Sequence, residues 1–358
     1  MKMKRWKGVF AAFLCICLLL AGCGRREEEA PASQEAEGSS VEGGEVKIGL
    51  SFDSFVIERW IRDRDVFVDT AKKLGASVNV QNANGNVEEQ ISQIEYLIGR
   101  DIDVLVVVAA DCEALTEVME EAKAAGIKTL SYDRLILNAG TDLYVSFDNK
   151  AVGTLMAKAL KNAIPDGGDI FMIQGAEEDN NVKLVREGFE EELEGSNLNV
   201  VYQANCAGWL AEQAVEYLDE ALQEFPDVKG IMCGNDDIAS QVVRVLAEHR
   251  LAGKVQVVGQ DGDLAACQRI VEGTQTMTAF KSVELQAKVA ARYAVNMAKG
   301  EELERINSSI NDGSEEIPFC KLQPIAVTSK NMDEIIIDAG FHSEEDVYLN
   351  VMKEQEEP

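Results

Sequence analysis

Short apolar runs alternate with amphipathic stretches along most of this chain. Val104–Val108 is apolar at every position, and between such runs the apolar residues recur every three to four positions, as expected for helices. A strand that is apolar on both faces belongs in a parallel sheet with helices on each side. The alternation stops near Asn149 and then starts again. It therefore predicts an α/β fold with two open, doubly wound parallel-sheet lobes.

The predicted elements come from these runs and from the Gly, Pro and charged residues that bound them. Strands are predicted at residues 46–52, 77–81, 102–109, 127–132, 169–174, 198–203, 230–233, 255–259 and 276–279. Helices are predicted between them, and a longer helix at 283–299 follows the last of these strands. Residues 318–327 are predicted to be extended, and 335–337 form a last apolar run.

The first 45 residues have a different character. Lys2, Lys4, Arg5 and Lys7 precede an apolar run at 9–20 that is shorter than the ~20 residues of a membrane span. Leu-Ala-Gly-Cys at 20–23 resembles the lipobox of bacterial lipoproteins, which implies lipidation at Cys23 after removal of 1–22. The alternative is an ordinary cleaved signal with an incidental Cys. Residues 23–45 are polar and acidic, and we expect a flexible tether.

Charge and composition exclude several functions. The net charge is −29, from 63 acidic and 34 basic residues, which argues against nucleic acid and against adhesion of the folded body to anionic lipid. Five cysteines lie beyond the first 45 residues, at 112, 206, 233, 267 and 320, with no CxxC pair. A disulfide framework or a zinc site is therefore disfavoured. There is no glycine-rich nucleotide loop either, so we expect neither cofactor nor metal.

Polar residues recur where the predicted strands end. Because ligands of open α/β sheets bind at the carboxyl ends of the strands, these positions are candidates for one site. They are Asp53, Arg59, Asp133, Arg134, Asp179, Asn181, Trp209, Asn235, Asp236, Asp261 and Lys281. Each also has a structural explanation: Asp133 with Arg134 could be a surface ion pair, and Asn235, Asp236, Asp261 and Asp263 are good helix caps. Collectively they suggest a cleft between the lobes.

The chemistry of this set favours a ring with many hydroxyls. Carboxylate, amide and guanidinium groups can each bond to neighbouring hydroxyls, and an indole can cover the C–H face of a sugar. Trp209 and Trp60 are the aromatic candidates. Catalysis is disfavoured because the two His residues lie in no known motif. The carboxylates come with Arg and Lys, which should hold them ionised rather than ready to act as a glycosidase acid.

Residues 46–341 resemble the periplasmic sugar-binding proteins of the ribose/galactose type. The resemblance is carried by Glu-Arg-Trp-Ile-Arg-Asp-Arg-Asp at 58–65, Ser-Tyr-Asp-Arg at 131–134, Asp-Asn-Asn at 179–181, Gly-Asn-Asp at 234–236 and Gly-Gln-Asp at 259–261. The first two are similar to the xylose branch. The resemblance implies that sugar is bound by Arg59, Asp133, Arg134, Asp179, Asn181, Trp209, Asn235, Asp261 and Lys281. Trp60, beside Arg59, completes the candidate set.

The resemblance also implies a three-strand hinge, with crossovers near Asn149, near Ser282 and between Asn311 and Phe319. The N-terminal lobe would then be 46–149 plus 283–311, and the C-terminal lobe 150–282 plus 312–342. We expect the acidic tail, 343–358, to be frayed.

These observations predict a monomeric lipoprotein on the outer face of the cell membrane or in the periplasm. It would capture D-xylose or a close monosaccharide and deliver it to an ABC permease. One alternative is a binding protein that signals to a membrane histidine kinase or chemoreceptor. Another is a glycan-processing hydrolase. A transcriptional repressor of related fold is disfavoured by the export signal and the missing basic headpiece.

Overall fold

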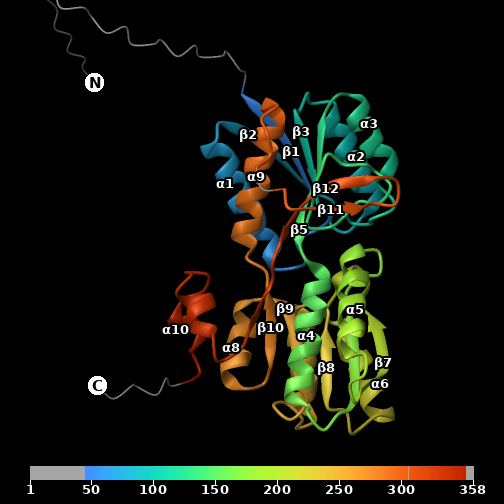
Figure 1. The fold of residues 1–358 in the computed structure, drawn as a ribbon, viewed down its shortest axis with the longest axis vertical. Helices are drawn as coiled ribbons and strands as arrows, with labels where there is room; N and C mark the ends of the chain where they lie inside the picture. Colours follow the sequence, from blue (N-terminus) through green and yellow to red (C-terminus); the bar gives the residue numbers. More distant parts are fainter. Residues whose placement is uncertain (1–44, 305, 352–358) are drawn as a thin grey trace, which may run out of the picture. The chain divides into compact units, whose positions relative to one another are not determined.

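The computed structural model describes residues 45–304 and 306–351 (Figure 1). The predicted leader, the lipidation site at Cys23 and most of the tether lie outside these residues. Among the described residues, no helix combines the length and the apolar character needed to cross a membrane.

The first lobe is built on a seven-stranded sheet in the order β11-β12-β5-β4-β3-β1-β2. All pairs are parallel except β11 with β12. The inner strand β3 is buried along its whole length, as its continuous apolar sequence predicts. The lobe consists of β1 (Val46–Phe52), α1 (Arg59–Lys73), β2 (Ala76–Asn82), α2 (Val87–Ile98), β3 (Val104–Val107), α3 (Thr116–Ala124), β4 (Lys128–Tyr132), β5 (Leu143–Phe147), α9 (Val283–Lys299), β11 (Ser308–Asn311) and β12 (Glu316–Leu322).

The second lobe has a six-stranded sheet in the order β13-β10-β9-β8-β6-β7, with only β13 antiparallel. Its elements are α4 (Asn149–Ala163), β6 (Gly168–Gln174), α5 (Asn180–Leu193), β7 (Leu198–Asn205), α6 (Gln213–Glu224), β8 (Gly230–Cys233), α7 (Asp236–Glu248), β9 (Gln256–Asp261), α8 (Leu264–Glu272), β10 (Met277–Phe280), β13 (Ile325–Val327) and α10 (Glu344–Val347). The predicted fold class, two doubly wound parallel-sheet lobes, is confirmed.

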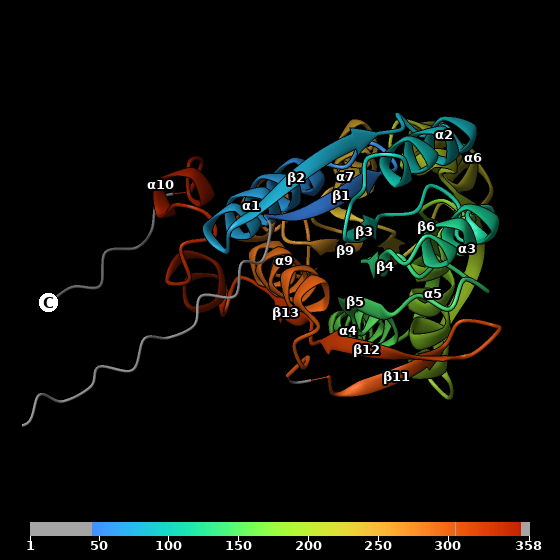
Figure 2. The same cartoon turned by 90° about the horizontal axis from the view of Figure 1, so that it is seen from above.

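The third crossover lies later in the chain than we expected. Strand β12 pairs with β5 of the first sheet, with Phe319 opposite Tyr144, and the two aromatic rings stack at 4.5 Å between centroids. Figure 2 shows β11 and β12 side by side at this edge. The chain therefore passes to the second lobe at 323–324, not between Asn311 and Phe319. The apolar pattern identifies the strand but does not say which sheet it joins.

The chain beyond Ser343 is not frayed up to residue 351. The Ser343 hydroxyl accepts a hydrogen bond from the Asp346 amide and caps α10. Val347 is 1% exposed and belongs to the apolar cluster that contains Ile270 of α8. Hydrogen bonds from Gln268 to the Asp346 carbonyl oxygen and from Asn350 to Glu272, both at 2.8 Å, also join this segment to α8. Residues 352–358 lie outside the described part of the chain.

Helices α4 and α5 touch through glycines. A Cβ atom on Gly153 would lie 1.9 Å from the Val185 carbonyl oxygen, and one on Gly188 would lie 2.0 Å from the Lys150 carbonyl oxygen. These backbone contacts leave no room for a side chain. We expect Gly153→Ala to lower the free energy of unfolding by about 1–3 kcal/mol, because the two helices must separate. Urea unfolding measures this.

Gly99→Ala is the matched control for Gly153→Ala. Gly99 has a φ of −68°, and a Cβ there would make only ordinary contacts at 3.5–3.7 Å. Its unfolding midpoint should equal that of the parent protein. Equal midpoints for both variants would contradict the steric argument.

Candidate functional site

The two lobes meet around a hollow with about 290 Å³ of free space, including its open mouth. Its walls are mostly charged groups from the loops that follow the strands. The lining residues are Ile57, Arg59, Trp60, Asp133, Arg134, Asp179, Asn181, Trp209, Gln260, Asp261 and Lys281. Of the ten residues predicted to bind sugar, all except Asn235 are in this set, whereas the wider candidates Asp53 and Asp236 are not. Arg59, Trp60, Asp133 and Arg134 come from the first lobe, and Asp179, Asn181, Trp209, Asp261 and Lys281 come from the second lobe or its junction with α9.

Arg59 is the first of two buried cations in the hollow. Its guanidinium forms ion pairs with Asp63 at 3.0 Å, Asp133 at 3.2 Å and, across the lobes, Asp261 at 3.6 Å. Gln286 of α9 accepts a further hydrogen bond from Nη2 at 2.8 Å. Because Asp63 lies one helical turn from Arg59 on α1, the helix itself presents the pair to the cleft. Asp63 and Gln286 thus hold Arg59 in place without lining the hollow.

Arg134 is the second buried cation. It pairs with Asp53 of its own lobe and, through Nε, with Asp179 of the other lobe at 2.8 Å. The Ala109 carbonyl oxygen accepts a bond from Nη1 at 2.8 Å. Trp60 contacts both cations: its ring centroid lies 4.5 Å from the Arg59 guanidinium carbon and 5.6 Å from that of Arg134. The indole face is a favourable neighbour for each of these charges.

Three site residues have a left-handed backbone although none is glycine. Their φ angles are 62° at Asp133, 60° at Trp209 and 102° at Asp261. This conformation is costly for residues with a Cβ, and it persists only where surrounding contacts hold it. At Asp133 the carbonyl oxygen accepts bonds from the hydroxyls of Tyr144 at 2.8 Å and Ser146 at 2.7 Å. The sharp turns direct the side chains at the strand ends into the cleft.

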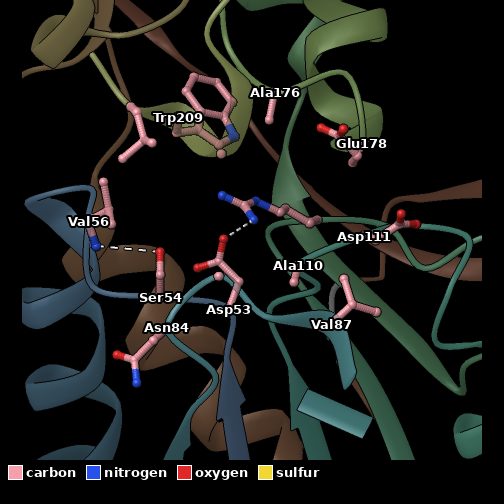
Figure 3. Close-up of a pocket in the computed structure, with 14 residues that line it drawn as sticks. Asp53, Ser54, Val56, Asn84, Val87, Ala110, Asp111, Ala176, Glu178 and Trp209 are labelled. Carbon is pink, nitrogen blue, oxygen red and sulfur yellow. Dashed lines mark hydrogen bonds and ion pairs between the residues drawn. The ribbon is translucent and has the colours of Figure 1, made fainter. Parts of the chain in front are cut away.

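The indole ring of Trp209 packs directly against the backbone of a glycine, Gly175. A Cβ on Gly175 would lie 2.3 Å from atoms of the indole ring, so only glycine permits this approach. Figure 3 shows Trp209 facing Asp53 across the adjoining outer hollow, which shares Arg134 and Trp209 with the inner one and has about 1010 Å³ of free space including open solvent. Beside it, the Cys112 amide of the first lobe donates to the Glu178 carbonyl oxygen of the second at 3.0 Å.

Several buried polar atoms around the inner hollow have no hydrogen-bond partner among the described residues. Donors and acceptors are both represented: Arg59 Nη1, Trp60 Nε1, Arg134 Nη2, Trp209 Nε1, Gln260 Oε1 and Asp261 Oδ1. Asp261 Oδ1 lies 2.8 Å from Lys281 Nζ as an ion pair, but the two atoms are not aligned for a hydrogen bond. Buried polar groups are nearly always bonded in native proteins. The arrangement is therefore suited to a ligand with several hydroxyl groups.

The carboxylates of the site differ in their pKa values. Burial raises the pKa of Asp133, but Arg59, Lys281 and Gln286 outweigh burial and leave it below its usual value. At Asp179, burial outweighs Arg134 and the pKa is raised. We expected the neighbouring Arg and Lys residues to prevent any rise in the pKa values of the site carboxylates. This is correct for Asp133 and wrong for Asp179. The pKa of Arg59 is raised, because its carboxylate partners outweigh burial.

Asn235 does not line the hollow. It is 1% exposed, and its Oδ1 accepts a hydrogen bond from the Ile238 amide at 2.9 Å, which caps α7. The helix-cap alternative thus accounts for its Oδ1, whereas its Nδ2 has no hydrogen-bond partner among the described residues. Ile57 and Gln260 line the hollow and were not predicted. Gln260 precedes Asp261 in β9 and lies within the Gly-Gln-Asp stretch at 259–261 that carries the family resemblance, which is the signal that could have identified it.

The comparisons with known proteins agree with this geometry. Residues 48–302 match the model of the periplasmic binding protein domain. The D-xylose-binding periplasmic protein of Haemophilus influenzae is 44% identical over 87% of this chain and 94% of its own length. The Escherichia coli protein of the same name is 42% identical over 85% and 93%.

Solved structures show the same fold. An ABC transporter solute-binding protein from Clostridium phytofermentans with bound β-D-glucose has a TM-score of 0.78 and 26% identity, over 84% of this chain and 99% of that one. One from Mycobacterium smegmatis with bound glycerol has a TM-score of 0.75 and 30% identity, over 84% and 100%. The chain therefore belongs to the periplasmic binding protein family, among sugar-binding proteins of the ribose/galactose type that act in transport and are not enzymes.

Proposed function

We propose that this protein captures D-xylose, or a close monosaccharide, in the inner hollow and delivers it to an ABC permease. The observation that carries the proposal is the set of buried, unpartnered polar atoms that both lobes direct into one small space. A sugar offers hydroxyl donors and acceptors on its edge and C–H groups on its faces. The relatives that are 42–44% identical and are named for D-xylose support this choice of sugar.

Each type of side chain has a role in this proposal. Asp133, Asp179 and Asp261 accept hydrogen bonds from hydroxyls, whereas Arg59, Arg134 and Lys281 donate to hydroxyl or ring oxygens. Asn181 can do both, and Trp60 and Trp209 cover the ring. A pentose has about ten non-hydrogen atoms, so micromolar binding needs about −0.8 kcal/mol per atom, which small ligands can reach.

Sugar binding and lobe closure are coupled in this proposal. Polar contacts already join the lobes at the hollow: Arg59 with Asp261, Arg134 with Asp179, and the Asn181 amide donating to Asp133 Oδ1 at 3.1 Å. A ligand that contacts both lobes binds the closed form better than the open form and shifts the population toward it. A permease could then distinguish loaded from empty protein.

The proposal also places the protein at the membrane through a lipid on Cys23. Its support is the Leu-Ala-Gly-Cys sequence after a basic and apolar leader. A polar tether from 24 to 45 would leave the sugar-binding lobes free to reach a permease.

A panel of monosaccharides tests the choice of ligand. D-xylose, L-arabinose, D-ribose and D-glucose should be compared by thermal shift and by calorimetry. We expect D-xylose to raise the melting temperature most and to bind with a micromolar or lower Kd, because a ligand that binds only the native state stabilises it. No shift and no heat with any of the four sugars would contradict the proposal.

A further inference from the structure

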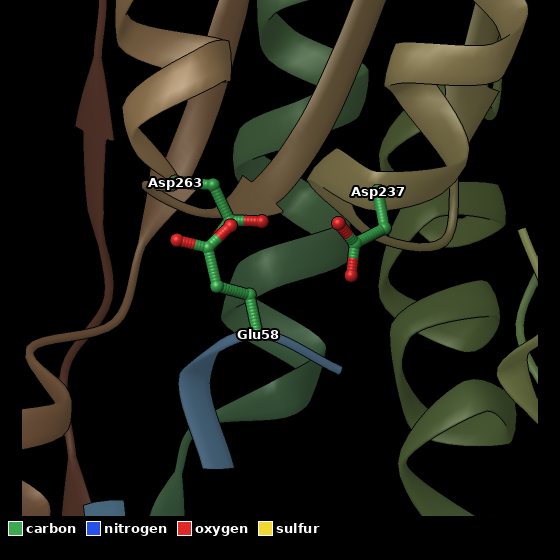
Figure 4. A group of neighbouring side chains, drawn as sticks. All are labelled: Glu58, Asp237 and Asp263. Carbon is green, nitrogen blue, oxygen red and sulfur yellow. The ribbon is translucent and has the colours of Figure 1, made fainter. Parts of the chain in front are cut away.

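Three carboxylates from the two lobes converge beside the inner hollow (Figure 4). Glu58 of the first lobe immediately precedes Arg59 of α1. In the second lobe, Asp237 is in the first turn of α7, and Asp263 precedes α8. One carboxylate oxygen from each residue lies within 4.8 Å of one from each of the others. The group exists only while the lobes are closed, since one of its members comes from the opposite lobe.

No basic side chain forms an ion pair with this group. In residues 45–304 and 306–351, no salt bridge includes Glu58, Asp237 or Asp263. Arg62, four residues after Glu58, is paired with Glu284 at 2.7 Å. Like charges at this separation repel, so the closed form needs a positive charge here.

Asp263 gives a second and independent indication of a ligand. Its Oδ2 atom is almost inaccessible to solvent and has no hydrogen-bond partner among the described residues. Asp at a helix N-cap ordinarily bonds the backbone of the first turn, but the Asp263 side chain makes no such bond to α8. Its carboxylate instead faces that of Glu58 in Figure 4.

The raised pKa values of two of these carboxylates agree with a local excess of negative charge. Burial, followed by the charges of Asp261 and Glu58, raises the pKa of Asp237 to about 6, although the Glu58 backbone N–H and the Arg269 charge partly offset the rise. Burial and the neighbouring carboxylates also raise the pKa of Asp263.

We propose that lobe closure assembles a site for a divalent cation of the calcium type from Glu58, Asp237 and Asp263. Calcium takes six to eight oxygen ligands at about 2.3–2.6 Å, so oxygens around one ion can lie up to about 5 Å apart. Three carboxylates supply between three and six of these ligands. Because Glu58 is exposed, water can supply the remainder.

The site couples cation binding to sugar binding. The ion gains all three carboxylates only in the closed form, and this step rests on the proposed function, in which sugar also favours closure. Each ligand must then raise the affinity of the other by the same factor. The cation would act as a latch that holds the loaded protein shut.

Calorimetry of the purified protein tests the site. Titration with D-xylose in 2 mM CaCl2 should give a Kd about fivefold or more below that in EDTA. Titration with CaCl2 in saturating xylose should show one binding site. Glu58→Gln and Asp237→Asn should each abolish the calcium effect and still bind xylose in EDTA. Asp65→Asn, at an exposed acid on the same helix α1, is the control that should keep the calcium effect.

The outcomes separate this inference from the proposed function. Equal xylose affinity in CaCl2 and EDTA, with no heat from CaCl2, would overturn the cation site and leave sugar binding intact. A xylose affinity that changes with pH but not with calcium would also overturn the cation site, because the three carboxylates would then take up a proton instead of a cation. Absence of xylose binding in every buffer would refute the proposed function instead, and the CaCl2 titration would still decide whether the carboxylates bind an ion.

Discussion

Arg134→Met is expected to weaken D-xylose binding by about 100- to 1,000-fold. Arg134 is 2% exposed. It forms one ion pair with Asp53 of its own lobe and one with Asp179 of the other lobe. Its loss leaves two buried carboxylates without their cation. Breaking a buried pair in this way costs about 3–5 kcal/mol, and every 1.4 kcal/mol is a factor of ten in Kd. Methionine preserves much of the side-chain volume, so the effect reports on charge.

Calorimetry measures the affinity, and Arg244→Met provides the control. Arg244 is 54% exposed and pairs with Glu248 on the surface of α7, a type of pair that contributes about 0–1 kcal/mol. Its xylose Kd should match that of the parent. If Arg134→Met binds xylose as tightly as the parent does, Arg134 is not part of the sugar site.

Arg59→Met should have the largest effect on stability. Three carboxylates depend on this guanidinium: Asp63, Asp133 and Asp261. We expect a loss of about 3–5 kcal/mol in the free energy of unfolding, together with loss of sugar binding, because the remaining buried charges repel one another. Urea unfolding with and without D-xylose measures both.

The same helix supplies the control for Arg59→Met. Arg64 is 33% exposed and pairs with the exposed Asp65, so Arg64→Met should change stability by less than about 1 kcal/mol. A double variant, Arg59→Met with Asp63→Asn, should recover part of the lost stability, since it removes one of the unpaired carboxylates. Equal losses in the Arg59 and Arg64 variants would show that the buried network does not stabilise the lobe.

The sheet and helix pattern was predictable because it depends on neighbours in the chain. The fully apolar β3 could only be an inner strand, and α9 begins and ends at 283 and 299, as the periodicity predicts. The site was predictable for a related reason. Parallel strands place their carboxyl ends at one edge, so Asp133 after β4 and Asp261 at the end of β9 were expected at the cleft.

Other features depended on contacts between residues far apart in the chain. Gln286 bonds to Arg59 and Asp133 from more than 150 positions away, and nothing in the α9 sequence marks it as part of the site. The same is true of Asn235, whose amide suits a sugar and a helix cap equally well until its partner is seen.

Local sequence patterns therefore specified the elements, their order and the edge of each sheet where ligands bind. Tertiary packing decided that β12 joins the first sheet, that Val347 docks the acidic tail, and that Glu58 meets Asp237 and Asp263. The physical reason is the range of the interactions. Periodicity and capping act within a few residues, whereas strand pairing, side-chain burial and charge clustering depend on which distant segments the fold brings together.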